Sequence, residues 1–278
     1  MFEYTDALLK RVQMTEFGIL RDFKQICLDN GLHYFLIGGT LLGAARHGGF
    51  IPWDDDIDVG MARADYDKFI SLWPTVCATR YPQYFLQCKE LDEKTALPYA
   101  KLRLNGTAFV EKETVDTDQH KGIFMDIFPF DALPERVPFS FRWRYRWFRL
   151  FMVVSEYKNG YRGFSNKGKH LLCAAFSCLS YRRINRFERN LMTSFNRQDC
   201  PYCTSMASGY GYARHRMPRE NLYGGEILFE GEPFECPHDP DAYLKHLFGD
   251  RYMELPPVEK RVTVHNVIEI KFPEGTDT

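Results

Sequence analysis

The chain has 278 residues, of which 45% are hydrophobic and 26% are charged. Its 36 Lys and Arg residues nearly balance 37 Asp and Glu residues, for a formal net charge of −1. This composition excludes collagen-like, low-complexity and disordered chains, and the length allows a sizeable core without disulfides. The neutral balance argues against a protein that coats nucleic acid.

The first predicted element is an amphipathic helix over 6–30, where apolar residues recur every three or four positions before a glycine stop. The apolar run 33–37 is rich in strand-forming residues and leads directly into Gly38-Gly39. Thr40 is the expected N-cap of a short helix over 41–47.

A glycine- and proline-bearing loop is expected over 48–53, and the second half of 54–61 alternates as a strand does. Residues 65–73 are predicted to be helical, with an end at Pro74. Further strands are predicted at 84–88, 99–104 and 123–128. This mixture of short strands and helices favours an α+β or α/β lobe.

The composition changes after residue 135. Residues 139–189 carry twelve Lys and Arg against two Glu, and we expect this basic, aromatic segment to be mostly helical. Residues 200–278 are expected to be loop-rich, with an acidic tail. We therefore predict a catalytic core over 1–135 and a second part over 136–278 that packs on it.

The cellular compartment is predicted from cysteine use and from the absence of apolar targeting segments. The eight cysteines are expected to stay reduced, because disulfide frameworks are typical of short secreted chains. The start of the chain lacks the apolar core of a signal peptide, and no uncharged apolar stretch approaches the length of a membrane span. We therefore expect a soluble cytoplasmic protein.

An acidic run, DDDID, follows the glycine pair Gly38-Gly39 within a short distance. On an extended backbone Asp54, Asp56 and Asp58 share one face, while Ile57 points to the other. Crowded carboxylates disfavour joint ionisation unless a cation intervenes, and oxygen ligands suit Mg²⁺ or Mn²⁺. The glycine pair and the helix start behind it offer backbone N–H groups to a phosphate. Together these features predict a metal–phosphate site.

The run over 38–61, GGTLLGAARHGGFIPWDDDIDVGM, closely resembles the signature of the LicD family, phosphocholine transferase-like proteins with fukutin and fukutin-related proteins as distant relatives. Further segments that resemble family blocks are 101–107, 122–129, 229–231, 243–244, 248–253, 255–257 and 259–265. The resemblance covers most of the chain and is weakest at 139–200.

The resemblance implies an α+β, nucleotidyltransferase-like fold: a mixed β-sheet core with flanking helices, followed here by the mostly helical, basic insert. It also implies that Asp56 and Asp58 form an Asp-x-Asp pair and that Asp126 is the third acid. These three would be catalytic and would hold one or two Mg²⁺ or Mn²⁺ ions. The residue pattern agrees, because Asp126 is a lone charge in the apolar run 123–130 and is costly there unless paired or metal-bound. A satisfied structural carboxylate is the alternative.

The resemblance further implies a CDP-linked alcohol donor, typically CDP-choline, and a cell-surface glycan acceptor such as teichoic acid, lipopolysaccharide or capsule. An acceptor hydroxyl would attack the phosphorus distal to cytidine. The residues expected to bind substrate are Gly38, Gly39, Thr40, Arg46, Asp54, Lys101, Arg103, Arg261 and His265.

Two other functions fit the same residues. A nucleotidyltransferase would move a nucleoside monophosphate to a small molecule or protein and release pyrophosphate. A non-catalytic glycan- or membrane-binding module would use the acidic cluster to hold Ca²⁺. A metal-dependent glycosyltransferase fits the acids but not the glycine pair before them.

Two weaker signals lie in the second half of the chain. Cys200, Cys203, Cys236 and His238 have the residue types of a zinc site, although the second pair is irregularly spaced, and reduced buried thiols are the alternative. The segment 139–189 combines Arg with Trp, Tyr and Phe. It is expected either to contact the inner membrane surface or an anionic glycan lipid, or to be ordinary helices. No nucleic-acid partner is expected.

Overall fold

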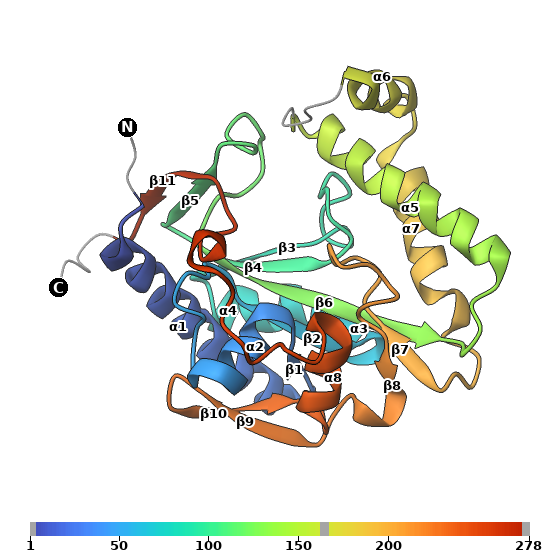
Figure 1. Ribbon diagram of the computed structural model, residues 1–278. Helices are drawn as coiled ribbons and strands as arrows, with labels where there is room; N and C mark the ends of the chain where they lie inside the picture. The colour runs from blue at the N-terminus through green and yellow to red at the C-terminus, as the bar shows by residue number, and fades with distance from the viewer. Residues whose placement is uncertain (1–3, 162–166, 274–278) are drawn as a thin grey trace.

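The computed structural model describes residues 4–161 and 167–273 (Figure 1). The α-helices are α1 (Asp6–Asn30), α2 (Gly38–His47), α3 (Arg63–Leu72), α4 (Ala78–Arg80), α5 (Phe139–Lys158), α6 (Lys167–Phe176), α7 (Tyr181–Met192) and α8 (Pro240–Phe248). The strands are β1 (Phe35–Leu36), β2 (Asp58–Ala62), β3 (Tyr84–Gln87), β4 (Ala100–Leu104), β5 (Ala108–Glu111), β6 (Phe124–Leu133), β7 (Tyr202–Thr204), β8 (Met217–Pro218), β9 (Gly225–Phe229), β10 (Glu232–Cys236) and β11 (Val267–Lys271). The helices flank a mixed sheet, which confirms the predicted α+β class.

The central sheet has the strand order β1-β2-β6-β4-β3. The C-terminal end of β6 pairs with β7, and β7 pairs with β8. Strands β2 and β6 are parallel, whereas β4 is antiparallel to β6. The register places Asp58 opposite Asp126 and Asp126 opposite Lys101. Residues directly opposite one another point to the same face of a sheet, so these three side chains form a row across β2, β6 and β4.

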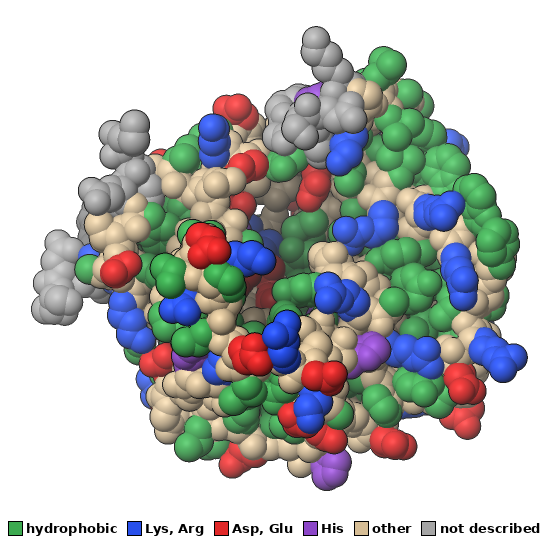
Figure 2. Space-filling view, in the orientation of Figure 1, with side chains coloured by type: hydrophobic (Ala, Val, Ile, Leu, Met, Phe, Trp, Pro, Cys, Tyr) green, Lys and Arg blue, Asp and Glu red, His purple; other side chains and the backbone are tan. Residues whose placement is uncertain are grey.

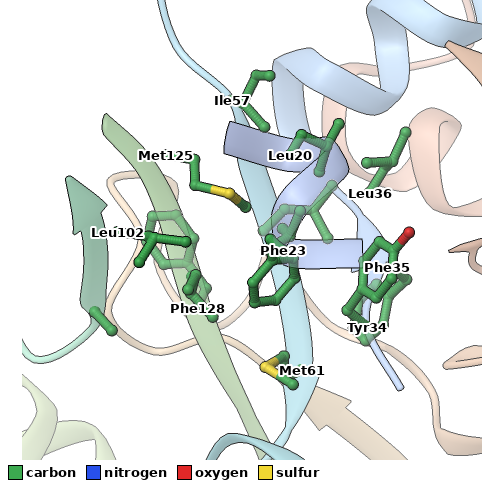
Figure 3. Packing of buried hydrophobic residues seen from close by; sticks show 14 of the residues in the cluster. Leu20, Phe23, Tyr34, Phe35, Leu36, Ile57, Met61, Leu102, Met125 and Phe128 are labelled. Carbon is green, nitrogen blue, oxygen red and sulfur yellow. The ribbon is translucent and has the colours of Figure 1, made fainter. Parts of the chain in front are cut away.

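Helix α1 is the predicted amphipathic helix, with the predicted bounds. The Thr5 hydroxyl accepts a hydrogen bond from the Leu8 N–H at its start, and Gly31 ends it in the left-handed conformation at φ 58°. Its apolar face packs against the sheet, where Leu20 and Phe23 belong to the same buried cluster as Ile57 and Met61 (Figure 3). This packing covers the face of the sheet opposite the row of polar residues.

The C-terminal part of the chain contributes to the same core. Phe229, Phe234, Tyr243 and Leu247 are fully buried within the cluster that α1 and the sheet form. The region predicted to be loop-rich contains the short strands β7 to β11 and helix α8, which the sequence did not indicate. The division at residue 135 stays a prediction.

Two local expectations were wrong. Helix α2 begins at Gly38, with Ile37 as its N-cap, and Thr40 lies inside the helix. The reason is that Gly38 adopts φ 56°, a left-handed conformation that turns the chain from strand to helix three residues earlier than expected. α-Helical bonding in α3 does end before Pro74, but the chain continues in a π-helical segment, Trp73–Cys77.

The basic segment is mostly helical, as predicted, and forms α5, α6 and α7. These helices stand together beside the sheet and pack through their own apolar clusters (Figure 1). Arg162 and the acidic tail over 274–278 lie outside the described residues. In the part of the chain that is described, no helix is long and apolar enough to cross a bilayer.

Cys200, Cys203, Cys236 and His238, considered as zinc ligands, do not form a zinc site, since among the described residues no three such side chains are grouped to hold a metal ion. Cys203 and Cys236 are buried, and their thiols lie next to the backbone carbonyls of Met217 and Pro237. The seven cysteines whose side chains are described are free thiols, as predicted, while the Cys77 side chain lies outside the described residues. Except for the exposed Cys178, these thiols are buried in the packing of the protein.

Candidate active site

The row of charged side chains on the sheet is held together by one strong ion pair. The Lys101 ammonium contacts the two carboxylate oxygens of Asp126 at 2.6 Å and 2.8 Å. It also lies 3.7 Å from the centre of the Phe124 ring. Asp58 neighbours Asp126 on the other side, so a single cation faces two adjacent carboxylates.

The loop before β2 brings further carboxylates to the same place. Asp54 and Asp56 line one cavity together with Asp58 and Asp126, whereas Ile57 is fully buried behind them. This is the alternation that the sequence predicted. The loop is fixed from behind, because the Gln13 side chain donates a hydrogen bond to the Asp54 carbonyl at 2.9 Å.

The glycine pair allows the carboxylates to approach the start of α2. A Cβ atom on Gly39 would lie 2.7 Å from Oδ2 of Asp54, and one on Gly38 would lie 3.1 Å from Oδ2 of Asp58. Any larger residue at Gly39 would displace the Asp54 carboxylate or the helix start. The backbone N–H groups at the first turn of α2 therefore lie beside the acidic cluster.

The carboxylates of this cluster are held in an environment that resists their ionisation. Burial, followed by the charge of Asp56, raises the pKa of both Asp54 and Asp58 well above its usual range. Burial also raises the pKa of Asp56, against the opposing effect of His265. Such a site favours any cation that enters it.

A second cation is supplied by the C-terminal segment. Nδ1 of His265 lies 2.9 Å from Oδ1 of Asp55, whose side chain is fully buried. Burial lowers the pKa of His265, but the hydrogen bond to Asp55 and the charges of Asp56 and Asp55 outweigh it and raise the pKa to about 9. His265 is therefore protonated at neutral pH and lines the cavity next to the aspartates.

The cavity has a volume of about 620 Å³ and opens between the β5–β11 ribbon and the basic helices. Figure 2 shows it as a hollow near the middle of the molecule. Its aspartate end is built from the loop before β2 and from β6. Its other walls come from β5 and the segment after it, from the end of α5, and from residues 209–210 and 264–266.

Another part of the cavity lining, the Glu111–Glu156 wall, is acidic. Next to the aspartate row lies Tyr99, whose ring stacks on Phe128 at a centroid distance of 4.3 Å and lies 5.4 Å from the Lys101 ammonium. Burial raises the pKa of Glu156 to about 7, with Arg149 and Lys89 opposing the shift. This wall could not be predicted from the sequence, because its residues come from separate strands and helices.

Several predicted substrate residues lie outside the cavity lining. Thr40 accepts a hydrogen bond from the Asp58 N–H at 2.8 Å, so it supports the site from behind. Arg46 donates to the carbonyls of Tyr252 and Glu254, and Arg261 donates to the carbonyl of Pro256. The Gly38 N–H points to the Tyr243 hydroxyl at 3.4 Å.

Arg103 does line the cavity, but its hydrogen bonds are made within the protein. Its guanidinium donates to the Gln87 side chain at 2.5 Å and to the Gly122 carbonyl at 2.9 Å. Burial lowers the pKa of Arg103 to about 10, with Asp126 opposing the shift. It contributes positive charge near the middle of the cavity.

Glu16 is a site residue that the sequence reading missed. It is fully buried on α1, both carboxylate oxygens lack a hydrogen-bond partner, and burial together with Asp56, Asp55 and Asp54 raises its pKa well above the usual range. A signal was available, because Glu16 lies four residues after Val12 on the apolar face of the helix. A carboxyl group in that position resists ionisation and lies beneath the acidic loop.

The residues fit a hard divalent cation by their chemistry. Among the described residues, no three His, Cys, Asp or Glu side chains are grouped so as to hold a metal ion on their own. However, Asp54, Asp56 and Asp58 face one cavity, and none of them has an ion-pair partner within the described chain. Mg²⁺ takes one or two carboxylates and completes its shell with water and substrate phosphates. Two of these aspartates with a bound diphosphate would satisfy it.

Known proteins with similar sequences are consistent with this arrangement. The family described as LicD/FKTN/FKRP, nucleotidyltransferase domain, matches residues 31–149. The lipopolysaccharide cholinephosphotransferase LicD of Haemophilus influenzae is 30% identical over 266 residues, which cover 92% of this chain and 96% of the relative. An uncharacterized protein of Rickettsia typhi is 27% identical over 151 residues, 46% of this chain and 48% of that protein. The human ribitol 5-phosphate transferase FKRP is 60% identical over 35 residues, 13% of this chain and 7% of FKRP.

Proposed function

The chain belongs to the LicD family, and from this we propose that it is a Mg²⁺- or Mn²⁺-dependent transferase that moves phosphocholine from CDP-choline to a hydroxyl of a cell-surface glycan. The observation that carries the proposal is the row of Asp58, Asp126 and Lys101 on adjacent strands at one end of a cavity. The name of the Haemophilus relative favours lipopolysaccharide as the acceptor. The free thiols of the described cysteines support a reducing compartment, the cytoplasm.

Two parts of the cavity lining match the two parts of the donated group. The aspartate end, with Lys101 and His265 beside it, suits a diphosphate bound together with a divalent cation. The Glu111–Glu156 wall, together with the ring of Tyr99, suits the trimethylammonium of choline. That group donates no hydrogen bond and is recognised by negative charge and aromatic faces.

The reaction requires one proton transfer and one in-line displacement. The acceptor hydroxyl attacks the phosphorus that carries choline, the bond to the oxygen of the cytidine phosphate breaks, and CMP leaves. We infer that one carboxylate of the Asp56 and Asp58 pair takes the hydroxyl proton. Lys101 and the protonated His265 offset charge that develops on the phosphoryl oxygens. A divalent ion held by Asp56, Asp58 and Asp126 would neutralise the diphosphate and the leaving group.

Product analysis tests the reaction class. Purified protein is given either CDP-choline or CTP, together with Mg²⁺ or Mn²⁺ and lipopolysaccharide, and release of CMP and pyrophosphate is followed by chromatography. We expect CMP, and we expect Asp56→Asn and Asp58→Asn to lower its release at least 100-fold. The exposed Asp199→Asn is the matched control. Pyrophosphate from CTP would instead indicate nucleotidyl transfer, and no nucleotide turnover or binding would indicate a binding module.

The headgroup is tested separately. At pH 8, above the Glu156 pKa of about 7, Glu156→Gln removes a negative charge from the wall assigned to choline while it keeps the size of the side chain. We expect it to raise KM for CDP-choline about tenfold and to leave KM for CDP-ribitol and CDP-glycerol nearly unchanged. Equal effects on charged and uncharged donors would show that this wall does not select choline.

A further inference from the structure

Helix α5 exposes a stripe of aromatic side chains. Phe139, Trp143 and Trp147 follow one another at four-residue spacing, so they lie along one face, and they are 73%, 49% and 42% exposed. The opposite face of the helix packs inward through the buried Phe141 and Phe148. Exposed Trp and Phe in a row are not explained by the packing of the fold.

The stripe is bordered by arginines that have no acidic partner. Arg142, Arg144 and Arg146 are exposed, and within the described chain none of them forms an ion pair, although Arg146 lies 5.0 Å from the Trp143 ring centre. Figure 2 shows basic and hydrophobic side chains intermingled over this part of the surface. Helix α6, which packs against α5, adds Leu171, which is 75% exposed.

The combination identifies the chemistry of the partner. An anionic polymer in water would satisfy the arginines but would leave the Phe139 and Trp side chains exposed. A second copy of the chain would place like charges against one another. A bilayer with anionic lipids satisfies both, since arginines bind the headgroups while Trp and Phe insert at the level between headgroups and acyl chains.

We propose that the outer face of α5 binds the surface of an anionic membrane. The far end of the same helix reaches the cavity, which Glu156 and the following Asn159 line. A helix lying on the membrane would therefore hold the cavity close to the lipid surface. A glycan built on a lipid carrier would meet the site without leaving the membrane. This inference concerns binding alone and does not depend on the chemistry proposed above.

Sedimentation with lipid vesicles tests the proposal. The full chain is mixed with vesicles of phosphatidylcholine alone or with phosphatidylglycerol, and bound protein and tryptophan emission are measured. We expect binding to the anionic vesicles only, with a blue shift of the emission and weakening by salt. The triple variant R142Q/R144Q/R146Q is expected to bind about 100-fold more weakly. We expect W143S/W147S to lose at least tenfold and to lose the blue shift.

Matched surface variants provide the control. Leu228→Ser and Arg251→Gln replace exposed residues elsewhere on the protein and are expected to bind vesicles as the unaltered chain does. Equal binding to neutral and anionic vesicles, or α5 variants that bind like these controls, would overturn the proposal. Self-association that W143S/W147S abolishes, without vesicle binding, would assign the face to a second copy instead. CDP-choline binding should be the same in every variant, so a failure here leaves the proposed reaction standing.

Discussion

Acid should destabilise this protein through one buried histidine. His215 is 2% exposed, and its Nδ1 lies 3.1 Å from the Tyr243 hydroxyl. Burial, and to a lesser degree the charge of His246, lowers the pKa of His215 to about 4 from the usual 6.5. As the pH falls, the unfolded chain binds a proton at this histidine at a higher pH than the folded chain does. The free energy of unfolding therefore keeps its full value above about pH 6.5 and decreases as the pH falls from 6.5 toward 4.

The size of the effect follows from the difference between the two pKa values. The interval from 6.5 to about 4, at about 1.4 kcal/mol per pH unit, gives roughly 3 kcal/mol in total. About 2 kcal/mol of this is lost between pH 7 and pH 4.5. The aspartates of the cavity contribute with the opposite sign, because their pKa values are raised and the folded state gains stability as they become protonated. A single stability curve would mix the two effects.

A difference measurement separates them. Urea unfolding of the unaltered chain and of His215→Gln is followed from pH 7 to pH 4.5, and the two free energies of unfolding are subtracted at each pH. The aspartates are common to both proteins and cancel, so the difference should shrink by about 2 kcal/mol toward the acid end. Tyr243→Phe removes the hydrogen bond but keeps the histidine buried, so it should retain the pH dependence. Parallel curves for the unaltered chain and His215→Gln would refute the reasoning.

Three further changes test the support of the site. Gly39→Ala should lower turnover at least tenfold without unfolding the protein, because the new Cβ would lie 2.7 Å from Asp54 Oδ2; Gly18→Ala on α1 meets nothing within 4 Å and serves as the control in the same assay. Asp131→Ala should lower the free energy of unfolding in urea by about 3–5 kcal/mol, because the buried Arg63 loses its bidentate partner. Lys101→Met should lower the melting temperature, because Asp126 loses its cationic partner. Millimolar Mn²⁺ should then raise the melting temperature of this variant by more than it raises that of the unaltered protein. An equal Mn²⁺ shift in both proteins would contradict the role of Lys101 as the partner of Asp126.

The acidic end of the site could be predicted because it is local in the sequence. Alternation along an extended chain put Asp56 and Asp58 on one face with Ile57 behind them, and that pattern needs no knowledge of the fold. Asp126 stood out as a charge within an apolar run, and the register of β2 and β6 places it directly opposite Asp58. The α+β class followed from the same alternation of short strands and helices.

The Glu111–Glu156 wall of the cavity could not be predicted because it depends on the pairing of segments that are far apart in the sequence. β5 pairs with β11 across most of the chain, and this ribbon places Glu111 at the cavity. Glu156 reaches the same cavity only because the end of α5 lies at it, and α5 is positioned by an apolar cluster of its own that includes Phe141 and Phe148. Neither residue belongs to a motif. The pairing of Lys101 with Asp126 was also not anticipated, although both residues had been singled out.

Burial of the acidic cluster lowers the free energy of unfolding. Some of its carboxylates have a cationic partner and others do not, and this difference indicates how the site is used. Asp54, Asp56 and Asp58 gain no ion-pair partner of their own within the described chain, while Asp126 and Asp55 are matched by Lys101 and His265. The three unmatched carboxylates therefore keep their repulsion until a cation arrives. A divalent ion that arrives with the donor diphosphate would relieve that repulsion, so donor and metal should each raise the affinity for the other. Binding CDP-choline in the presence and absence of Mn²⁺ would measure this coupling directly, and equal affinities would show that the cluster does not act as a shared metal and phosphate site.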